Sequence, residues 1–344
     1  MSIVDDIAKS LGVSTATVSR ALNDRPGVSS KLRESVLTKA RELNYTPNMT
    51  ARGLATSQTF NIGFFFHRKP HLPANSDPFY AEILHSVQQV IARSDYHIAF
   101  EALSDEILNR PNDFRFVRER RIDAMILAGP DIPAGFITAM RQSNLPIVLV
   151  DNRLDFSPVN CVNSDDEDGA YRAALHLIGL GHTFIGVLAG PMDWASTARR
   201  VRGYQRALMT GGLDLMTVHR EETSIDSGRQ AYRLLMEQYP DITAICAVND
   251  SMAIGAIREA RTHGMSIPKD LSVVGFDDIS WAELNDPPLT TVRIPRHQIG
   301  KEAAHRVLML LQDPELMASE VVVPVTMVER QSTAIKEVKR SHIK

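Results

Sequence analysis

Cysteine is scarce in this sequence, which has two, Cys161 and Cys246, in 344 residues. Both lie in apolar runs far apart in the chain, so we expect two buried small side chains rather than a disulfide, a metal site or a nucleophile. No apolar run approaches the roughly 20 residues of a membrane span, and the N-terminus has no signal-peptide core. The sequence therefore predicts a cytoplasmic protein with no membrane partner.

Signatures of catalysis and of metal binding are lacking as well. The sequence holds no Ser-His-Asp arrangement and no His-Glu-x-x-His motif, which disfavours a hydrolytic enzyme. The acidic run at 165–168 is interpreted as a helix start, where carboxylates complement the helix dipole. We expect no catalytic residue, no metal and no cofactor.

An overall excess of positive charge is also missing, since the formal net charge is −3. The charge is unevenly distributed: residues 1–60 hold 8 basic and 5 acidic residues, whereas residues 61–344 hold 30 and 36. A basic head on an acidic body is compatible with nucleic-acid binding by the head alone. The length suggests two or three domains, and a hydrophobic content of 44% supports a substantial core.

The basic head has the pattern of a helix, a tight turn and a second helix. Apolar residues recur at helical spacing over 3–11, Gly12 ends that helix, and Ser14 can accept a hydrogen bond from the next helix. The inward face of the second helix carries Val18, Ala21 and Leu22. Its outward face carries Thr15, Ala16, Thr17, Ser19 and Arg20. These short side chains and one guanidinium fit a DNA major groove, although a small helical bundle with a solvated face has the same pattern.

A third helix is predicted over 31–43, with Ser29 and Ser30 as candidate N-caps. The stretch that follows, 49–57, is a weak helix former, because Thr50, Gly53 and Thr56 lower helix propensity.

Three motifs in this head occur in a specific order. They are Gly12-Val13-Ser14-x-x-Thr17-Val18-Ser19-Arg20, Leu43-Asn44-Tyr45-x-Pro47-Asn48 and Ala51-Arg52-x-Leu54. Together they resemble the DNA-binding headpiece and hinge of the lactose-repressor (LacI/GalR) family of bacterial transcription regulators. The resemblance implies that Thr15, Ala16 and Arg20 read bases. It also implies a hinge helix that folds on DNA, with Leu54 as a wedge in the minor groove. The candidate DNA-binding residues are Thr15, Ala16, Thr17, Arg20, Asn23, Ser29, Asn48, Ala51, Arg52 and Leu54.

From residue 61, short β-rich runs alternate with longer amphipathic stretches. The predicted strands are 61–66, 96–101, 124–128, 147–151, 184–189, 215–219, 242–248 and 272–276. The predicted helices include 79–93, 170–180, 198–209, 227–237 and 252–262. This alternation predicts two similar α/β lobes, each a doubly wound parallel sheet, with a ligand crevice between them.

The later part of the chain extends the resemblance. Gly275-Phe276-Asp277-Asp278 and Pro287-Pro288-Leu289-Thr290-Thr291-Val292 resemble the family's regulatory core, which is built like a periplasmic sugar-binding protein. The resemblance implies three crossings between the lobes. The expected division is a helix-turn-helix headpiece (1–46), a hinge (47–60) and a core (61–340). Within the core we expect a first lobe of about 61–160 plus 290–320 and a second of about 161–289 plus 322–336. The C-terminus lacks leucine heptads, so a homodimer is expected.

The family's crevice positions supply the candidate effector-binding residues. They are Phe79, Tyr80, Asp151, Trp194, Ser196, Arg200, Thr223, Asn249 and Asp277. A guanidinium and a carboxylate, Arg200 and Asp277, can grip vicinal hydroxyls while aromatic rings stack on a sugar. A structural ion pair between the two is the competing interpretation. Thr223 departs from the pattern, since sugar- and purine-responsive members often have an aromatic residue there.

The combined hypothesis is a sequence-specific repressor of transcription. We expect it to bind palindromic double-stranded operator DNA as a homodimer, under the control of a small-molecule effector, most simply a sugar. A purine or a phosphorylated metabolite is the alternative effector. A sugar-binding transport module and an α/β enzyme are the alternatives from other functional classes.

Overall fold

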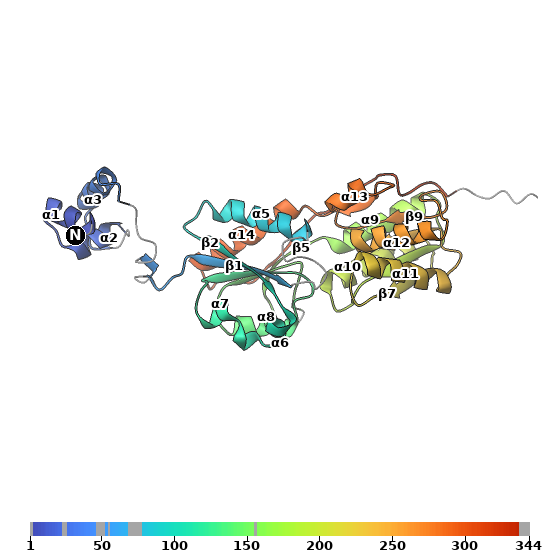
Figure 1. The fold of residues 1–344 in the computed structure, drawn as a ribbon, viewed down its shortest axis with the longest axis horizontal. Helices are drawn as coiled ribbons and strands as arrows, with labels where there is room; N and C mark the ends of the chain where they lie inside the picture. The colour runs from blue at the N-terminus through green and yellow to red at the C-terminus, as the bar shows by residue number, and fades with distance from the viewer. Residues whose placement is uncertain are drawn as a thin grey trace, which may run out of the picture. The chain divides into compact units, whose positions relative to one another are not determined.

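The computed structural model describes residues 3–22, 26–45, 52–53, 56–67, 78–154 and 157–336. The chain forms two compact units, Met1–Phe60 and Asn61–Lys344 (Figure 1). The first is all-α in its described part, and the second is built on parallel sheets, which confirms the predicted fold class. Within the described ranges, no helix is both long enough and apolar enough to cross a bilayer.

The first unit packs three helices around a small core. They are α1 (Ile3–Leu11), α2 (Thr15–Leu22) and α3 (Ser30–Glu42). Ile7, Val18 and Val36, one from each helix, are fully buried and hold the three together. Gly12 ends α1 with a φ of +64°, a left-handed conformation that glycine adopts without strain. The predicted caps are confirmed, since the Ser14 and Ser29 hydroxyls accept hydrogen bonds from backbone N–H groups of α2 and α3.

Close packing explains why a glycine, a poor helix former, is present at position 53. A Cβ atom at this position would lie 2.6 Å from the backbone oxygen of Gln58, so no larger residue fits this turn without a shift.

The first lobe of the second unit contains a six-stranded parallel sheet in the order β11-β5-β4-β3-β1-β2. Its strands are β1 (Asn61–His67), β2 (His97–Leu103), β3 (Ala124–Ala128), β4 (Ile147–Val150), β5 (Asn160–Ser164) and β11 (Glu320–Val323). Its helices are α5 (Pro78–Ile91), α6 (Asp105–Asn109), η1 (Pro111–Asp113), α7 (Arg115–Arg118), α8 (Ala134–Arg141) and α14 (Arg296–Gln312). Helices α5 and α14 pack together on one face, and α6, α7 and α8 lie on the other.

The second lobe repeats the same plan with four parallel strands in the order β7-β6-β8-β9. Its strands are β6 (Ile185–Ala189), β7 (Met216–His219), β8 (Ala244–Ala247) and β9 (Ser272–Val274). Its helices are α9 (Asp166–Gly179), α10 (Ala195–Thr210), α11 (Ile225–Gln238), α12 (Asp250–Thr262) and α13 (Ser280–Leu284). Helices α9 and α10 pack as one pair and α11 and α12 as another. All eight predicted strands are present, and both cysteines are free and buried as predicted.

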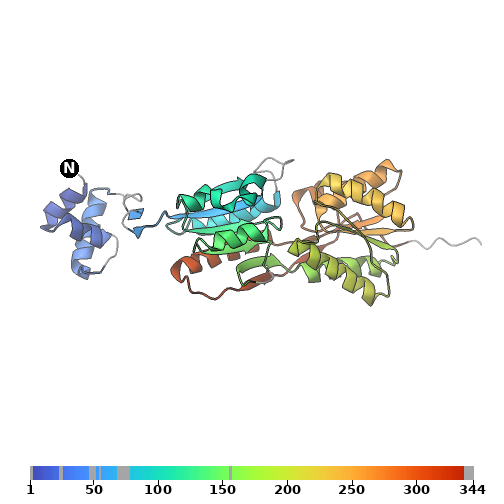
Figure 2. The same cartoon turned by 90° about the horizontal axis from the view of Figure 1, so that it is seen from below.

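Two boundaries between the lobes differ from the expected ones. Strand β5 pairs with β4 and β11, so the first lobe extends through Ser164 instead of ending near 160. Strand β11 belongs to the same sheet, so the last return to the second lobe begins after Val323 rather than at 322. A short antiparallel pair, β10 (Thr291–Arg293) and β12 (Thr326–Val328), accompanies these crossings. Figure 2 shows the red C-terminal helix α14 back beside the first lobe.

Candidate functional site

The exposed face of α2 has the composition expected of a DNA-reading surface. Thr15, Ala16 and Arg20 are exposed, while Val18 and Ala21 are buried against the other helices. The Arg20 side chain folds back, with Nε donating to the Ala16 carbonyl at 3.3 Å. The base-reading role of this face stays a prediction.

Other candidate DNA-binding residues have structural roles or lie outside the described part. Thr17 is half-buried and shares a hydrogen bond of 2.9 Å with the Ser14 hydroxyl, and Ser29 is the N-cap of α3. The Arg52 guanidinium lies over the Phe60 ring, 4.8 Å from its centroid. Four candidates lie outside the described residues: Asn23, Asn48, Ala51 and Leu54.

Arg200 is the centre of a buried charge cluster in the second lobe. Its side chain, on α10, is 7% exposed, and its Nε donates to Asp166 Oδ1 at 2.9 Å. Its Nη1 donates to Asp277 Oδ1 at 3.0 Å and to the Val248 carbonyl at 2.6 Å. The guanidinium also lies over the Phe276 ring, 4.0 Å from its centroid. The ion pair between Arg200 and Asp277, the competing interpretation of these two residues, is therefore present, and Asp166 is an additional partner.

Burial alone would lower the pKa of Arg200, because it disfavours the charged form. The carboxylates of Asp166 and Asp277 more than offset this and raise the pKa above its usual value. The guanidinium is therefore held permanently charged, and its Nε and Nη1 groups donate to protein acceptors.

Across from this cluster, Asp151 follows β4 in the first lobe. The Tyr80 hydroxyl, on α5, donates to Asp151 Oδ2 at 3.0 Å. Desolvation raises the pKa of Asp151 to about 7, and the carboxylates of Asp166 and Asp277 add to the rise. Acidic groups of the second lobe therefore contribute to the raised pKa of an aspartate in the first lobe.

The site carries unusual backbone conformations. Asp151, Asp277 and Asp278 have φ values of +55°, +110° and +53°, in a region that residues other than glycine rarely adopt. Such strain persists only where the surroundings impose it, and it is concentrated at functional sites. Asp250 supplies part of that support: its fully buried carboxylate accepts from the Ile279 N–H at 2.9 Å and from the Thr291 hydroxyl at 2.5 Å.

Arg296, at the start of α14, is a residue that the sequence pattern does not single out. Its guanidinium makes a two-point ion pair with Glu82 of α5, at 2.8 and 3.1 Å. It also donates to the backbone oxygens of Asp277 and Asp278, at 2.5 and 3.0 Å. Arg296 therefore ties α5 of the first lobe directly to the 277–278 loop of the second.

The aromatic candidates divide between the two lobes. Phe79 and Tyr80 are both buried at the start of α5, with their rings edge to face and 5.1 Å apart. Trp194 is partly exposed at the N-cap position of α10, and Ser196 is buried in the first turn of that helix.

Asn249 and Thr223 contact each other. The Asn249 side chain caps α12 by accepting from the Met252 N–H at 2.9 Å, and its amide donates to the Thr223 carbonyl at 3.1 Å. Both polar ends of the Asn249 side chain therefore have protein partners.

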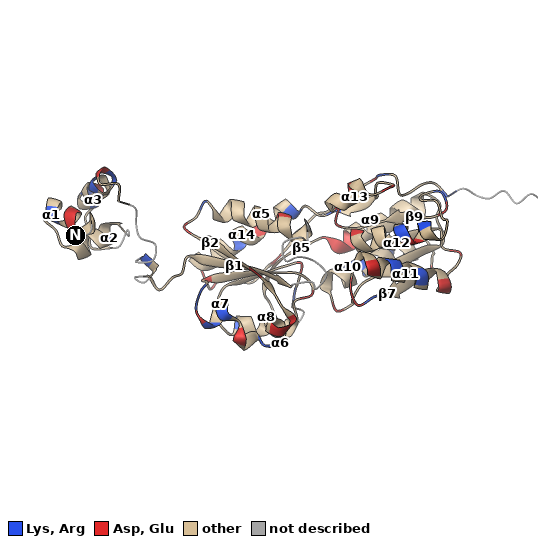
Figure 3. Cartoon of the chain, in the orientation of Figure 1, with Lys and Arg blue, Asp and Glu red and all other residues tan. Residues whose placement is uncertain are grey.

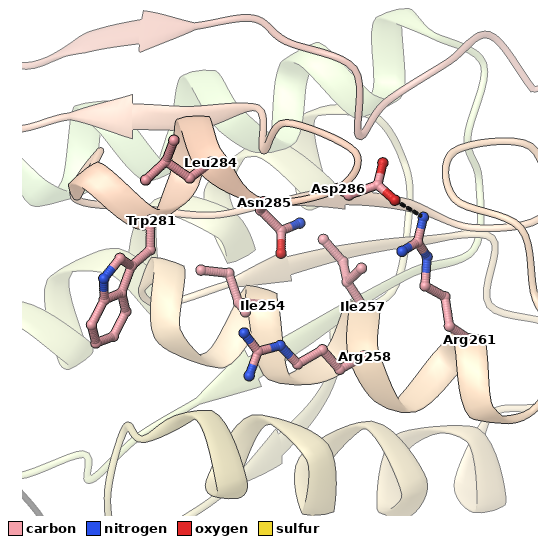
Figure 4. A pocket seen from close by; sticks show the side chains of 8 residues that line it. All are labelled: Ile254, Ile257, Arg258, Arg261, Trp281, Leu284, Asn285 and Asp286. Carbon is pink, nitrogen blue, oxygen red and sulfur yellow. Dashed lines mark hydrogen bonds and ion pairs between the residues drawn. The ribbon is translucent and has the colours of Figure 1, made fainter.

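A hollow of about 330 Å³ lies elsewhere, between α12 and α13 of the second lobe (Figure 4). Exposed apolar side chains border it: Trp281 is 40% exposed and Leu284 is 80% exposed. Across the hollow from them, α12 contributes Arg258 and Arg261, and Arg261 pairs with Asp286 at 3.0 Å.

Comparisons with known proteins agree with this geometry. Residues 3–48 match the family described as bacterial regulatory proteins, lacI family, and residues 174–333 match a periplasmic binding protein-like domain. A relative from Bacillus subtilis (strain 168), the probable HTH-type transcriptional repressor ExuR, is 32% identical over 94% of this chain and 95% of its own length. Catabolite control protein A of Priestia megaterium is 31% identical over 95% of this chain and 98% of its own.

Solved structures give the same result. A lac repressor dimer bound to operator and the anti-inducer ONPF is 28% identical, with a TM-score of 0.77, over 96% of this chain and 98% of that one. A complex of the transcriptional regulator CelR with cellobiose is 26% identical, with a TM-score of 0.73, over 96% and 99%. With its helical head and two-lobed core, this chain belongs to the lacI family of bacterial regulatory proteins and is a DNA-binding transcriptional repressor.

Proposed function

We propose that this repressor binds a palindromic operator as a homodimer and is controlled by a neutral, hydroxyl-rich small molecule, a sugar, held between its two lobes. The helix-turn-helix headpiece (1–46) and hinge (47–60) contact DNA in this proposal, with Thr15, Ala16 and Arg20 of α2 reading bases. The core binds the effector. A ligand can shift the repressor between states only by the difference in its affinity for them, so a site with groups from both lobes is suited to this control.

The observation that carries the effector proposal is the excess of acceptors around Arg200. The carboxylates of Asp166 and Asp277 both accept from the Arg200 guanidinium, and Asp151 adds a third acidic group that interacts electrostatically with this cluster. Such a site favours ligands that donate hydrogen bonds, as sugar hydroxyls do, and repels phosphate groups. Phe79, Tyr80 and Trp194 can supply apolar surface for a sugar ring. The cellobiose bound to the CelR relative is a ligand of this class.

A thermal-shift screen of the full-length protein tests this proposal. Neutral mono- and disaccharides, phosphorylated sugars and nucleobases are compared at millimolar concentration. A ligand at a hundred times its Kd stabilises the protein by about 2.7 kcal/mol. We expect a neutral sugar to raise the melting temperature, and we expect Asp277→Asn to weaken its binding at least roughly tenfold, or about 1.4 kcal/mol.

The matched control is Asp214→Asn, which removes the same charge from an exposed residue before β7. Binding should survive in this variant. If nucleobases alone raised the melting temperature, the effector would be a purine rather than a sugar. If phosphorylated sugars alone raised it, the argument that the acidic groups repel phosphate would be contradicted.

For the homodimer, we propose that the surface bordered by Trp281 and Leu284 forms part of the interface. Large exposed apolar side chains beside a hollow are typical of association surfaces, and the lac repressor relative is a dimer.

Leu284→Asp should place a carboxylate in the interface and raise the dimer dissociation constant at least about 30-fold, the effect of a 2 kcal/mol hot spot. Sedimentation velocity measures this, with Met209→Asp, at an exposed methionine of α10, as the control. An undiminished dimer in the Leu284 variant would exclude this surface.

A further inference from the structure

The segment from the headpiece enters the first lobe at the edge of the sheet where the parallel strands begin. In a parallel sheet all strands start at the same edge, and the helices that follow them return to it. This edge, which we term the amino edge, contains Asn61 at the start of β1, the end of α5, and the segment 115–123 that precedes β3. It is opposite the carboxyl ends of the strands, where Asp151 lies. The chain from the headpiece therefore joins the core at the amino edge.

Arginine is concentrated at this edge. Residues 115–123 contain four arginines and two acids, whereas acids outnumber bases by 36 to 30 over residues 61–344. Arg118, Arg120 and Arg121 are exposed, as is Arg93 just after α5. Figure 3 shows blue segments of the ribbon, which mark Lys and Arg residues, at α7 and the turn beside it. This end of the lobe thus departs from the acidic character of the core.

The arginine segment contacts the first residue of the core directly. The Asn61 side-chain amide donates to the Arg121 carbonyl at 3.3 Å, and the Asp123 N–H donates to the Asn61 carbonyl at 2.8 Å. These bonds hold the turn after α7 beside the point where the headpiece segment arrives.

The arginines are only partly neutralised. Glu119 is paired with Arg118 at 3.3 Å and also with Arg121. Within the described part of the chain, the structure pairs neither Arg93 nor Arg120 with a carboxylate. A cluster of guanidinium groups with surplus positive charge fits a polyanion.

The length of the connecting segment limits how far this edge can be from bound DNA. Eight residues separate Arg52 from Asn61, which span roughly 30 Å when fully extended. Whenever the headpiece and hinge are bound to a duplex, the amino edge is tethered within that reach. Tethering over such a distance gives a millimolar effective concentration, at which weak phosphate contacts form.

We propose that the amino-edge arginines, chiefly Arg118, Arg120 and Arg121, bind backbone phosphates of the same duplex that the headpiece reads. The partner is double-stranded DNA, and the contact is independent of sequence because it is made to phosphates. The core in this way adds affinity to the complex without adding base specificity. The inference rests on the DNA-binding role of the headpiece and assigns a second DNA contact to the core.

The test measures binding of the full-length protein to a 40-base-pair duplex of random sequence, by fluorescence anisotropy, between 50 and 200 mM KCl. The variant carries Arg118→Gln, Arg120→Gln and Arg121→Gln together. Each lost phosphate contact lowers the slope of log K against log salt by about 0.9. We therefore expect a slope lower by about 2 to 3 and an affinity at 50 mM KCl at least roughly tenfold weaker.

The matched control replaces three exposed arginines of the second lobe, Arg172, Arg202 and Arg206, with glutamine. It changes the net charge by the same amount and should leave the slope unchanged. An unchanged slope in the amino-edge variant, or an equal fall in the control, would overturn the proposal. Failure of the unmodified protein to bind any duplex would instead contradict the DNA-binding role itself. Melting temperatures verify that both variants are folded.

Discussion

Replacing Arg200 with leucine is expected to lower the free energy of unfolding by about 3 to 5 kcal/mol at pH 8. The guanidinium is 7% exposed and is shared by Asp166 and Asp277. Its removal leaves both carboxylates without their buried cation and leaves the Val248 carbonyl without its 2.6 Å donor. An isolated charge in such surroundings costs far more than the same charge in water. Urea unfolding measures the loss.

Arg202 provides the control two residues further along α10. It pairs with Glu167, but both side chains are well exposed, at 55% and 37%. Exposed ion pairs contribute at most about 1 kcal/mol, so Arg202→Leu should be nearly neutral. Arg200→Lys keeps the charge but loses the planar fork, and should fall between the two. Equal stabilities of the Arg200 and Arg202 leucine variants would show that the cluster does not support the fold and would leave ligand binding as its main role.

Asp151→Asn is expected to raise the free energy of unfolding, whereas loss of Arg200 lowers it. The increase should be up to about 4 kcal/mol at pH 8 and small at pH 4. Desolvation, reinforced by Asp166 and Asp277, raises the pKa of Asp151 from 3.8 to about 7. The folded state therefore holds its proton more tightly than the unfolded state. As the pH rises from 3.8, the cost of ionising this carboxyl grows, and it is complete above pH 7. An amide avoids this cost and can still accept from the Tyr80 hydroxyl.

Urea unfolding at pH 4, 6 and 8 measures this dependence. Asp214→Asn, at the exposed position used above, should show no growth in stability difference with pH. A constant difference for Asp151→Asn, or destabilisation at pH 8, would contradict the argument. Because the shift depends partly on carboxylates of the other lobe, the measurement also reports on whether the lobes remain together in solution.

The fold could be predicted where local pattern and burial agree. Strand β3 is apolar throughout and fully buried, so its sequence identifies it without further context. Strand β5 is equally buried but contains Asn160, Asn163 and Ser164. These polar groups are satisfied by distant partners, such as Arg306 for Asn160 and Glu320 for Asn163. The hydrogen-bond partners of Asn160 and Asn163 are 146 and 157 residues away in the sequence, so no local pattern identifies this strand.

The same reason limits prediction of the site. Arg200 and Asp277 could be named from the family resemblance, but Asp166 appeared only as one acid in a helix-initiating run. That interpretation is correct for Asp165, whose side chain caps α9, and incomplete for Asp166, which is 2% exposed beside Arg200. Asn249 illustrates the converse, since an asparagine before a helix serves as a cap whether or not it also contacts a ligand.

Arg296 connects the start of α5 to the 277–278 loop of the second lobe, so movement of that loop can be passed to the helix. This helix of 14 residues carries Glu82 near its start and ends just before Arg93 at the amino edge. At 1.5 Å per residue it is a rod of about 21 Å. Because Arg296 fastens one end to the 277–278 loop, a 10° tilt imposed there swings the other end by about 4 Å. The helix can therefore transmit a displacement of the 277–278 loop to the amino edge of the first lobe.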